Sequence, residues 1–323
     1  MYTLFELQSR IEKAIAAMDY PNHPKNLYAP IAYIMNLGGK RIRPALVLLA
    51  ADLFKGDIEE AIPAALAIET FHNFTLIHDD IMDNAPLRRG KQTVHEKWGT
   101  NNAILSGDVM MVESNKQLTK VKVEVLKDVL DTFNATAQGV CEGQQLDMEF
   151  EMREDVGITE YIDMIRLKTA VLVGGAMKIG AIVAGASKED ACLIYDFGEN
   201  LGIAFQLQDD ILDVYGDPEK FGKQIGGDII ANKKTYLLLK LQELAEQKDL
   251  AALASHAQNT TTLPAKIDSI KALYDEYDVK ELASQQMRDY LDKAFAALAK
   301  IKVPDEQKKE LITLANALMH RES

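Results

Sequence analysis

The sequence contains few cysteines and few prolines for a chain of 323 residues. The two cysteines, Cys141 and Cys192, are too few for a disulfide framework and lack the spacing of a zinc site. We expect both to be small core residues of a protein in a reducing compartment. The nine prolines leave long windows uninterrupted, which permits long helices.

Regular strand patterns are also lacking, because no segments that alternate apolar and polar residues take turns with helical stretches. Long windows are dominated by Ala, Leu, Lys, Glu and Gln, which favour helix. Apolar residues make up 47% of the chain, enough for a large core. The sequence therefore predicts an all-α fold. The length fits one large domain or two, and no interdomain linker is apparent.

Neither a long hydrophobic run nor an excess of positive charge is present. The most apolar stretch, residues 170–186, contains Lys178 and many small residues, so we expect a buried helix and no integral membrane segment. The N-terminal stretch is amphipathic and carries acidic residues early, unlike a signal peptide. The net charge of −13 argues against nucleic acid as a partner. We predict a cytoplasmic protein.

Two acidic clusters of the form DDxxD carry the strongest functional signal. Each ends an apolar run that predicts a helix, and Pro63 is expected to open the first of these helices. On a helix, the first and last aspartates of each cluster point the same way. Crowded carboxylates repel one another, and a hard cation such as Mg²⁺ relieves that repulsion. The candidate metal ligands are Asp79, Asp80, Asp83, Asp209, Asp210 and Asp213.

A single DDxxD in an acidic protein is at least as often a solvated acidic face as a metal site. Two copies in apolar helices, each with basic residues nearby, favour the metal site. Arg88 and Arg89 lie in a predicted loop at 84–100, where arginine forks suit a phosphate held between the two charges. The turn at 38–44 reads GGKRIRP and adjoins an apolar helix. By itself, that turn is equally consistent with a solvated basic surface.

Two further basic segments have similar alternatives. Lys168 directly precedes the apolar 170–186 stretch, and a lysine that enters a buried segment needs an anion. The glycine-rich loop after the second cluster contains several lysines and is able to close over an anion, or is a charged surface loop. The helix that carries Gln144, Gln145 and Asp147 is equally consistent with hydrogen bonds between helices and with a site.

Six ordered motifs between residues 38 and 236 resemble those of the trans-prenyltransferases, the polyprenyl diphosphate synthases. They read GGKRIRP, LIHDDIMD with RRG after it, GQQLD, LKT, FQLQDDILD and GKQIGGD. The resemblance covers about two-thirds of the chain. It implies a single all-α domain over residues 1–323, with helices around a deep central cavity, and usually a homodimer.

The resemblance also implies a role for each matching residue. Three Mg²⁺ ions would connect the two aspartate clusters to the diphosphate of an allylic substrate. The residues that would bind this diphosphate are Arg88, Lys168, Lys223 and Lys233. Those that would bind isopentenyl diphosphate are Lys40, Arg43, His72 and Arg89. Thr169 and Gln206 would point oxygen toward the allylic cation, and with Lys168 they are the predicted catalytic residues.

The length of the product would depend on side chains that precede Asp79 on the same helix. These are Phe74, Thr75 and Phe71, at five, four and eight positions before it. One aromatic beside a small threonine, with no insertion in the motif, resembles short-chain geranylgeranyl synthases. We expect a C20 product, with C15 next and a longer product as the remaining alternative. The two phenylalanines are also ordinary core residues.

Three rival interpretations remain. A terpene cyclase would use the same metal chemistry but usually lacks the second DDxxD and the paired arginines. A non-catalytic partner subunit of a hetero-oligomeric prenyl synthase would be expected to lose aspartates or cations. A plain helical scaffold does not explain six ordered motifs.

Overall fold

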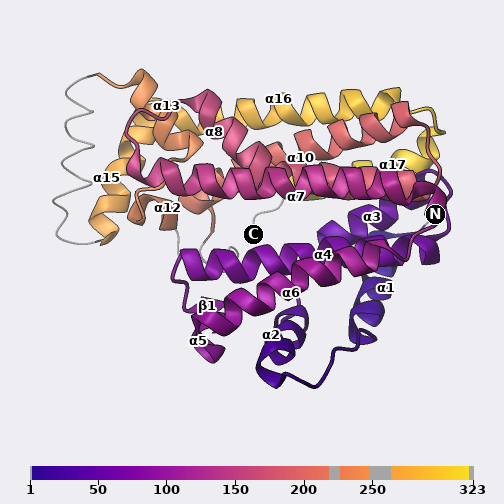
Figure 1. Ribbon diagram of the computed structural model, residues 1–323. Helices are drawn as coiled ribbons and strands as arrows, with labels where there is room; N and C mark the ends of the chain where they lie inside the picture. Colours follow the sequence, from indigo (N-terminus) through magenta and orange to yellow (C-terminus); the bar gives the residue numbers. More distant parts are fainter. Residues whose placement is uncertain (1, 218–225, 247–262, 320–323) are drawn as a thin grey trace. The chain divides into compact units, whose positions relative to one another are not determined.

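The structure is a computed structural model that describes residues 2–217, 226–246 and 263–319. Among these residues the regular elements are helices apart from one hairpin, β1 (Leu87–Arg88) and β2 (Lys91–Gln92) (Figure 1). The all-α prediction is therefore confirmed. The helices up to residue 118 are α1 (Leu4–Ala16), α2 (Lys25–Met35), α3 (Ile42–Leu53), α4 (Ile58–Met82), α5 (Val94–Trp98) and α6 (Thr100–Leu118).

The later helices include one π-helical turn, η1 (Arg166–Ala170), between two α-helices. The α-helices are α7 (Val123–Met152), α8 (Ile158–Ile165), α9 (Val171–Val183), α10 (Lys188–Tyr215), α12 (Gly227–Ile230), α13 (Tyr236–Leu244), α15 (Leu263–Glu276), α16 (Val279–Lys300) and α17 (Asp305–Met319).

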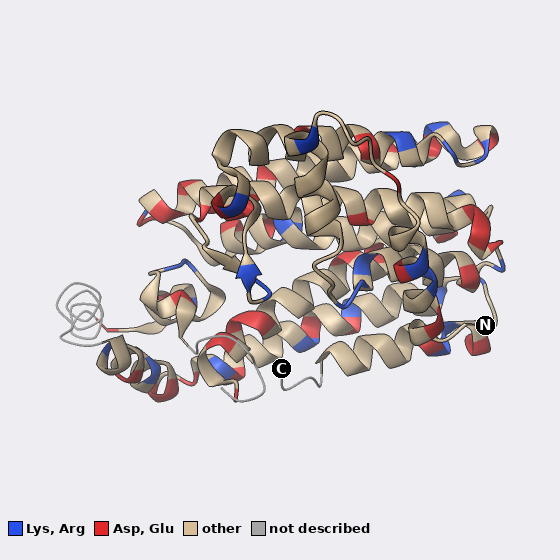
Figure 2. Ribbon diagram, turned by 90° about the horizontal axis from the view of Figure 1, so that it is seen from below, with Lys and Arg blue, Asp and Glu red and all other residues tan. Residues whose placement is uncertain are grey.

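Contacts between residues divide the chain into two compact units. Unit 1 comprises Met1–Ala137, Gly175–Tyr195 and Ile301–Leu311. Unit 2 comprises Gln138–Gly174, Asp196–Lys300 and Ile312–Ser323. The first aspartate cluster belongs to unit 1 and the second to unit 2. Acidic and basic residues are interspersed along the helices (Figure 2).

The core of unit 1 is built on α3, in which nine of twelve residues are buried. This helix packs against α4, and α4 also contacts α6 (Figure 1). Gly180 approaches α3 so closely that a Cβ on it would lie 2.0 Å from the carbonyl oxygen of Val47. Each fully buried Leu, Ile or Val side chain contributes about 1.5–3 kcal/mol. The helix that carries the first aspartate cluster is thus held along most of its length.

The prediction that Pro63 opens this helix is wrong, because α4 begins at Ile58. The side chain of Asp57 caps it by accepting a hydrogen bond of 2.9 Å from the backbone N–H of Glu59. Pro63 lies in the second turn, where its ring removes one backbone hydrogen bond. The cap and the buried face of α4 offset that loss.

The core of unit 2 gathers apolar residues from α8, α10, α13 and α15 around Tyr161 and Tyr274. Here η1 lies directly against α7. A Cβ on Gly143 of α7 would lie 2.1 Å from the backbone nitrogen of Lys168, so only glycine fits at this crossing. This contact sets the position of the π-helical turn that carries Lys168 and Thr169.

The expectation that the cysteines are core residues is wrong, because Cys141 and Cys192 are both exposed. Cys141 lies on the outward face of α7 with Gln138 and Gln145, which are also exposed. Composition does not report which face of a helix a residue occupies. Across the described part of the chain, every helix is too short or too polar to cross a membrane.

Replacement of Gly143 by alanine is expected to lower the free energy of unfolding by about 1–3 kcal/mol, because the added methyl group meets backbone that has no room to move. Thermal or urea unfolding measures this change. The control is Gly139→Ala on the same helix, where a Cβ would meet only side chains of Leu167 and Val171 at 3.4 Å or more. That variant is expected to be neutral or slightly stabilising, since alanine favours helix over glycine. Equal effects of the two changes would contradict the close approach.

Candidate active site

The first aspartate cluster lies at the C-terminal end of α4, where Asp83 is the capping residue. Asp80 is 1% exposed and is held by Arg88 in a bidentate pair. The Nε of Arg88 donates to both oxygens of Asp80 at 2.9 Å, and Nη2 donates to Oδ1 at 2.7 Å. Asp79 is 24% exposed, and one of its oxygens lies 3.9 Å from Nη2 of Arg88. Arg88 and the cluster are therefore adjacent and pair directly.

The hairpin explains how Arg88 reaches the cluster, and it corrects the prediction that residues 84–100 form only a loop. Arg88 pairs with Lys91 across the two short strands, and Arg89 and Gly90 form the turn with φ of 52° and 73°. Two consecutive left-handed residues are typical of a tight hairpin turn. α5 and the start of α6 occupy the remainder of the segment.

The turn residue Arg89 connects the hairpin to the GGKRIRP segment. Its guanidinium donates to the carbonyl oxygen of Gly38. Gly39 has φ of 134°, and a Cβ on it would lie 2.8 Å from the guanidinium carbon of Arg89. Two basic motifs thus lie side by side in unit 1, joined by a contact between residues 51 positions apart.

Arg43 and His72 meet in the same region. The Nη1 of Arg43 lies 3.3 Å from Nε2 of His72. Burial, and then the charges of Arg43 and Arg89, hold the pKa of His72 well below its usual value, so the ring is neutral. The Nε of Arg43 is buried without a hydrogen-bond partner, and burial lowers the pKa of Arg43. Exposed Lys40 belongs to the same turn. These cations with an unsatisfied donor suit an anion such as a diphosphate.

The buried ion pair between Arg41 and Glu69, which holds this basic turn, was not predicted from the sequence. Arg41 has φ of 47° and is 5% exposed. It donates to Glu69 at 2.5 Å, to Glu12 at 2.8 Å and to the carbonyl oxygen of Met35 at 2.6 Å. Glu69 is 2% exposed and also accepts a hydrogen bond of 3.0 Å from Asn73. The signal was present, since Glu69 follows a long apolar run and is spaced four residues from Asn73, on the same face of the helix.

The residues predicted to set product length stack along α4. Phe71 is fully buried, and its ring centroid lies 5.5 Å from that of Phe74. Phe133 of α7 packs edge-on against Phe71 at 5.4 Å. Thr75 donates its hydroxyl to the backbone carbonyl of His72 at 2.8 Å, so this small side chain is satisfied within its own helix.

In unit 2, Lys168 pairs with an anionic side chain, which a lysine that enters a buried segment needs. Its Nζ lies 2.5 Å from Oδ2 of Asp147 on α7. Thr169, the next residue of η1, donates to Oε1 of Gln206 on α10 at 3.5 Å. The structure therefore brings two of the three predicted catalytic residues, Thr169 and Gln206, into contact, whereas Lys168 pairs with Asp147. A single π-helical turn is frequent at functional sites, and here it presents Lys168 and Thr169 to α7 and α10 respectively.

The second cluster has one deeply buried member, Asp210, which is 4% exposed. Oδ2 of Asp210 accepts hydrogen bonds from the hydroxyl of Tyr161 and, at 3.1 Å, from the backbone N–H of Tyr236. Burial raises the pKa of Asp210 to about 7. Asp213 accepts a hydrogen bond of 3.1 Å from the backbone N–H of Asp228, and Asp209 is partly exposed.

Each cluster thus has the same division between buried and accessible carboxylates. Within the described ranges, no group of three or more His, Cys, Asp or Glu side chains is arranged as a closed metal site. Mg²⁺ does not need one, because it is usually held by one or two carboxylates together with water and substrate phosphates. The partly exposed Asp79 and Asp209 fit that mode of binding.

Two further lysines, Lys223 and Lys233, are predicted to bind the allylic diphosphate, and the structure describes one of them. Lys233 is exposed in the segment between α12 and α13. Lys223 lies outside the described residues.

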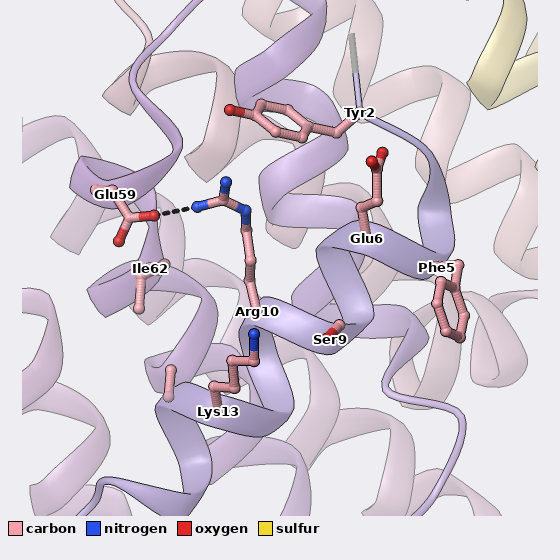
Figure 3. Close-up of a pocket in the computed structure, with 9 residues that line it drawn as sticks. Tyr2, Phe5, Glu6, Ser9, Arg10, Lys13, Glu59 and Ile62 are labelled. Atoms are coloured by element: carbon pink, nitrogen blue, oxygen red, sulfur yellow. Dashed lines mark hydrogen bonds and ion pairs between the residues drawn. The ribbon is translucent and has the colours of Figure 1, made fainter.

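A groove of about 620 Å³ lies on unit 1 between α1 and the start of α4 (Figure 3). Its lining includes Tyr2, Phe5 and Lys13 and contains none of the predicted site residues. Arg10 points across it to form an ion pair with Glu59 and lies 4.9 Å from the centroid of the Tyr2 ring. The groove therefore has a structural ion pair at its centre, and the candidate site is elsewhere.

An all-α fold with two DDxxD clusters and adjacent cations defines the class of diphosphate-processing enzymes to which the chain belongs. The family model for polyprenyl synthetase matches residues 24–276. The chain belongs to the polyprenyl synthetase family and is a prenyltransferase.

Relatives and solved structures agree with this membership. A geranylgeranyl diphosphate synthase from Methanosarcina mazei is 42% identical over 75% of each chain, and one from Sulfolobus acidocaldarius is 39% identical over 88% of each. A crystal structure of a geranylgeranyl pyrophosphate synthase superimposes with a TM-score of 0.94 over 100% of both chains, at 42% identity. A geranylfarnesyl diphosphate synthase from Natronomonas pharaonis is 34% identical over 82% of this chain and 83% of its own.

Replacement of Glu69 by glutamine is expected to lower the free energy of unfolding by about 3–5 kcal/mol, because it leaves the Arg41 guanidinium buried beside a neutral amide. Chemical denaturation measures the change. Glu12→Gln is the matched control: it removes the other carboxylate that pairs with Arg41, but Glu12 is 49% exposed and its loss should cost less than about 1 kcal/mol. A Glu69 variant as stable as the Glu12 variant would show that the buried pair is not required.

Proposed function

We propose that this prenyltransferase condenses isopentenyl diphosphate with an allylic diphosphate and gives mainly geranylgeranyl diphosphate, with farnesyl diphosphate as the next candidate. The proposal depends on one observation: Arg43, His72 and Arg89 lie near one another in unit 1, which also carries Asp79 and Asp80 in the last turn of α4. A diphosphate site next to a carboxylate cluster is what two-substrate chemistry of this kind needs. The names of the relatives support the C20 product.

We assign the two diphosphates to different cations. Arg88, Lys168, Lys223 and Lys233 bind the allylic diphosphate in this proposal, and Lys40, Arg43, His72 and Arg89 bind isopentenyl diphosphate. Neutral His72 acts as a hydrogen-bond partner, and the buried Nε of Arg43 supplies an unused donor. Arginine forks match phosphate oxygens in a bidentate geometry.

The six aspartates are proposed to hold Mg²⁺, with three ions per site. When bound, the metal neutralises the charge that develops on the leaving diphosphate. Asp79 and Asp209 are the partly exposed members that support direct ligation. Asp80 and Asp210 are already held by Arg88 and Tyr161, which fixes the orientation of each cluster.

The reaction is then divided among the chain's own residues. Arg88 and the lysines hold the leaving diphosphate, so the carbon–oxygen bond of the allylic substrate breaks with its electron pair on that group. The oxygens of Thr169 and Gln206 face the allylic cation. The double bond of isopentenyl diphosphate, held close and dry, attacks it. A proton leaves to the released diphosphate, so no protein base is assigned.

We propose that Phe74 and Phe71 form the floor that limits the product to C20. Phe74 is only partly buried, whereas Phe71 below it is fully buried and supported by Phe133. This order, with the more accessible ring nearer to Asp79, supports Phe74 as the residue that meets the end of the chain.

We also propose a single functional domain, a cytoplasmic location and a homodimer. The exposed face of α6 supports the dimer, because Leu105 and Val112 lie two turns apart and are 56% and 58% exposed. Apolar residues in register on one helix suit a second copy of the chain. Analytical ultracentrifugation tests this, and a monomer at micromolar concentration would contradict it.

The function is tested by incubating the protein with Mg²⁺, isopentenyl diphosphate and, in turn, dimethylallyl, geranyl and farnesyl diphosphate. We expect a mainly C20 alcohol after dephosphorylation, measured by chromatography against standards. The negative control is Asp79→Asn, which should lower kcat by about 10²–10³-fold because it removes a charged metal ligand. Folded wild-type protein that elongates no primer would favour the non-catalytic partner subunit, and cyclic hydrocarbon products would favour a terpene cyclase.

The floor is tested separately with Phe74→Ala and Thr75→Phe. The first change removes the accessible ring and should shift the main product beyond C20. The second adds an aromatic one residue nearer to Asp79 and should shift it toward C15. Product distributions from the same assay measure both. If neither variant alters the distribution while both remain active, Phe74 is not the floor and the two phenylalanines are ordinary core residues.

A further inference from the structure

Lys266 of α15 is buried at 5% exposure. Its Nζ donates to Oδ1 of Asn232 at 2.7 Å and lies 3.4 Å from the carbonyl oxygen of Ile230. Burial lowers the pKa of Lys266. Lysine is rarely buried unless its ammonium is satisfied, so these two oxygens are where it finds its hydrogen bonds.

One acceptor belongs to Ile230, the last residue of α12, and the other to Asn232, which lies in the short segment between α12 and α13, directly before Lys233. The segment has an unusual backbone, since Asn232 has φ of 53°. The backbone N–H of Lys233 donates to the carbonyl oxygen of Asp228 at 2.9 Å, and that of Thr235 donates to Lys233 at 3.1 Å. Backbone hydrogen bonds close this turn, and asparagine adopts the left-handed conformation more readily than most residues; the ammonium of Lys266 adds a contact to both Ile230 and Asn232.

The far end of this segment is fixed independently. The N–H of Tyr236 donates to Asp210 at 3.1 Å, and the hydroxyl of Thr235 caps α13 by accepting from Leu238 at 3.4 Å. α12 and α15 are also in contact, and Gly226 packs against the side chain of Ile267, next to Lys266. Lys233 therefore lies between two anchors: Lys266 on one side and the second aspartate cluster on the other.

We infer that Lys266 is a positioning residue that fixes the backbone from which Lys233 reaches the allylic diphosphate. The inference rests on the role proposed for Lys233. Lys266 itself does not contact substrate. Its ammonium fixes the backbone conformation of residues 230–232. That backbone sets the position from which the Lys233 side chain extends, relative to the second aspartate cluster.

The experiment compares Lys266→Met and Asn232→Gly with wild-type enzyme. Methionine keeps the apolar length of the side chain and removes the ammonium. Glycine removes the Asn232 acceptor but adopts a left-handed conformation freely, so the backbone geometry stays accessible. We expect each variant to raise KM for the allylic diphosphate about tenfold, with KM for isopentenyl diphosphate unchanged, because a small misplacement of a binding group has a large effect. The double variant should be no worse than the more impaired single variant.

Two further measurements separate the outcomes. Lys271→Met is the control on the same helix. Its side chain lies 4.9 Å from the ring of Tyr215, apart from the segment that precedes Lys233, and it should leave both KM values unchanged. Hydrogen exchange reports on residues 230–236 whatever the activity, and these amides should exchange faster in Lys266→Met while those of α16 do not.

Unchanged exchange in Lys266→Met would overturn the inference, as would a parallel rise in both KM values. If Lys233→Met raises KM for the allylic diphosphate but Lys266→Met and Asn232→Gly do not, the proposed function stands and the positioning role fails. A wild-type protein that elongates no primer overturns the proposed function instead. Asn232 is exposed, so its glycine variant keeps the test sound if the methionine variant folds poorly.

Discussion

A carboxylate that is taken out of water must find a cation or a hydrogen-bond donor, and this requirement fixes the surroundings of each aspartate cluster. Asp80 is paired with Arg88, and Asp210 is paired with Tyr161 and a backbone N–H. Leaving either carboxylate unpaired would cost several kcal/mol. The hairpin in unit 1 and the segment before α13 in unit 2 are therefore held in place by the aspartates of the clusters themselves.

The two aspartates of each DD pair therefore lie in different surroundings. The buried member is held by protein groups, and the other member is more exposed to solvent. The same division applies to the basic turn at 38–44. Arg41 is buried against Glu69, whereas Lys40 is exposed and Arg43 keeps an unsatisfied donor. Adjacent residues of one motif thus differ in burial and in how far their hydrogen bonds are satisfied.

The second constraint on the structure is close packing at two glycines, where a neighbouring segment leaves no room for a Cβ. Gly143 lets η1 lie against α7, and the absence of a Cβ on Gly39 leaves room for the guanidinium of Arg89. Neither glycine contacts the predicted metal ligands. They allow η1, which carries Lys168, to pack against α7, and the guanidinium of Arg89 to lie over the GGKRIRP turn.

Much of the fold and site could be predicted because helices obey local rules. Apolar periodicity gave the helices around both clusters, and the spacing of the DDxxD motif placed its first and last aspartates on one face. The motifs also identified the cations near them. The errors have local explanations too: a strong cap and a buried face override a proline at position 63, and composition does not report the exposed face on which Cys141 and Cys192 lie.

The sequence alone determined the all-α class, the two carboxylate clusters and the family, because these depend on residue types at short, regular spacings. Only the tertiary structure decided which partner each charged group has. Arg88 with Asp80, Arg41 with Glu69, and Lys168 with Asp147 are pairs separated by 8, 28 and 21 positions. The contact between Lys266 and Asn232 spans 34 positions. Such pairs follow from how helices pack and how the chain turns, and no periodicity within a single helix encodes them.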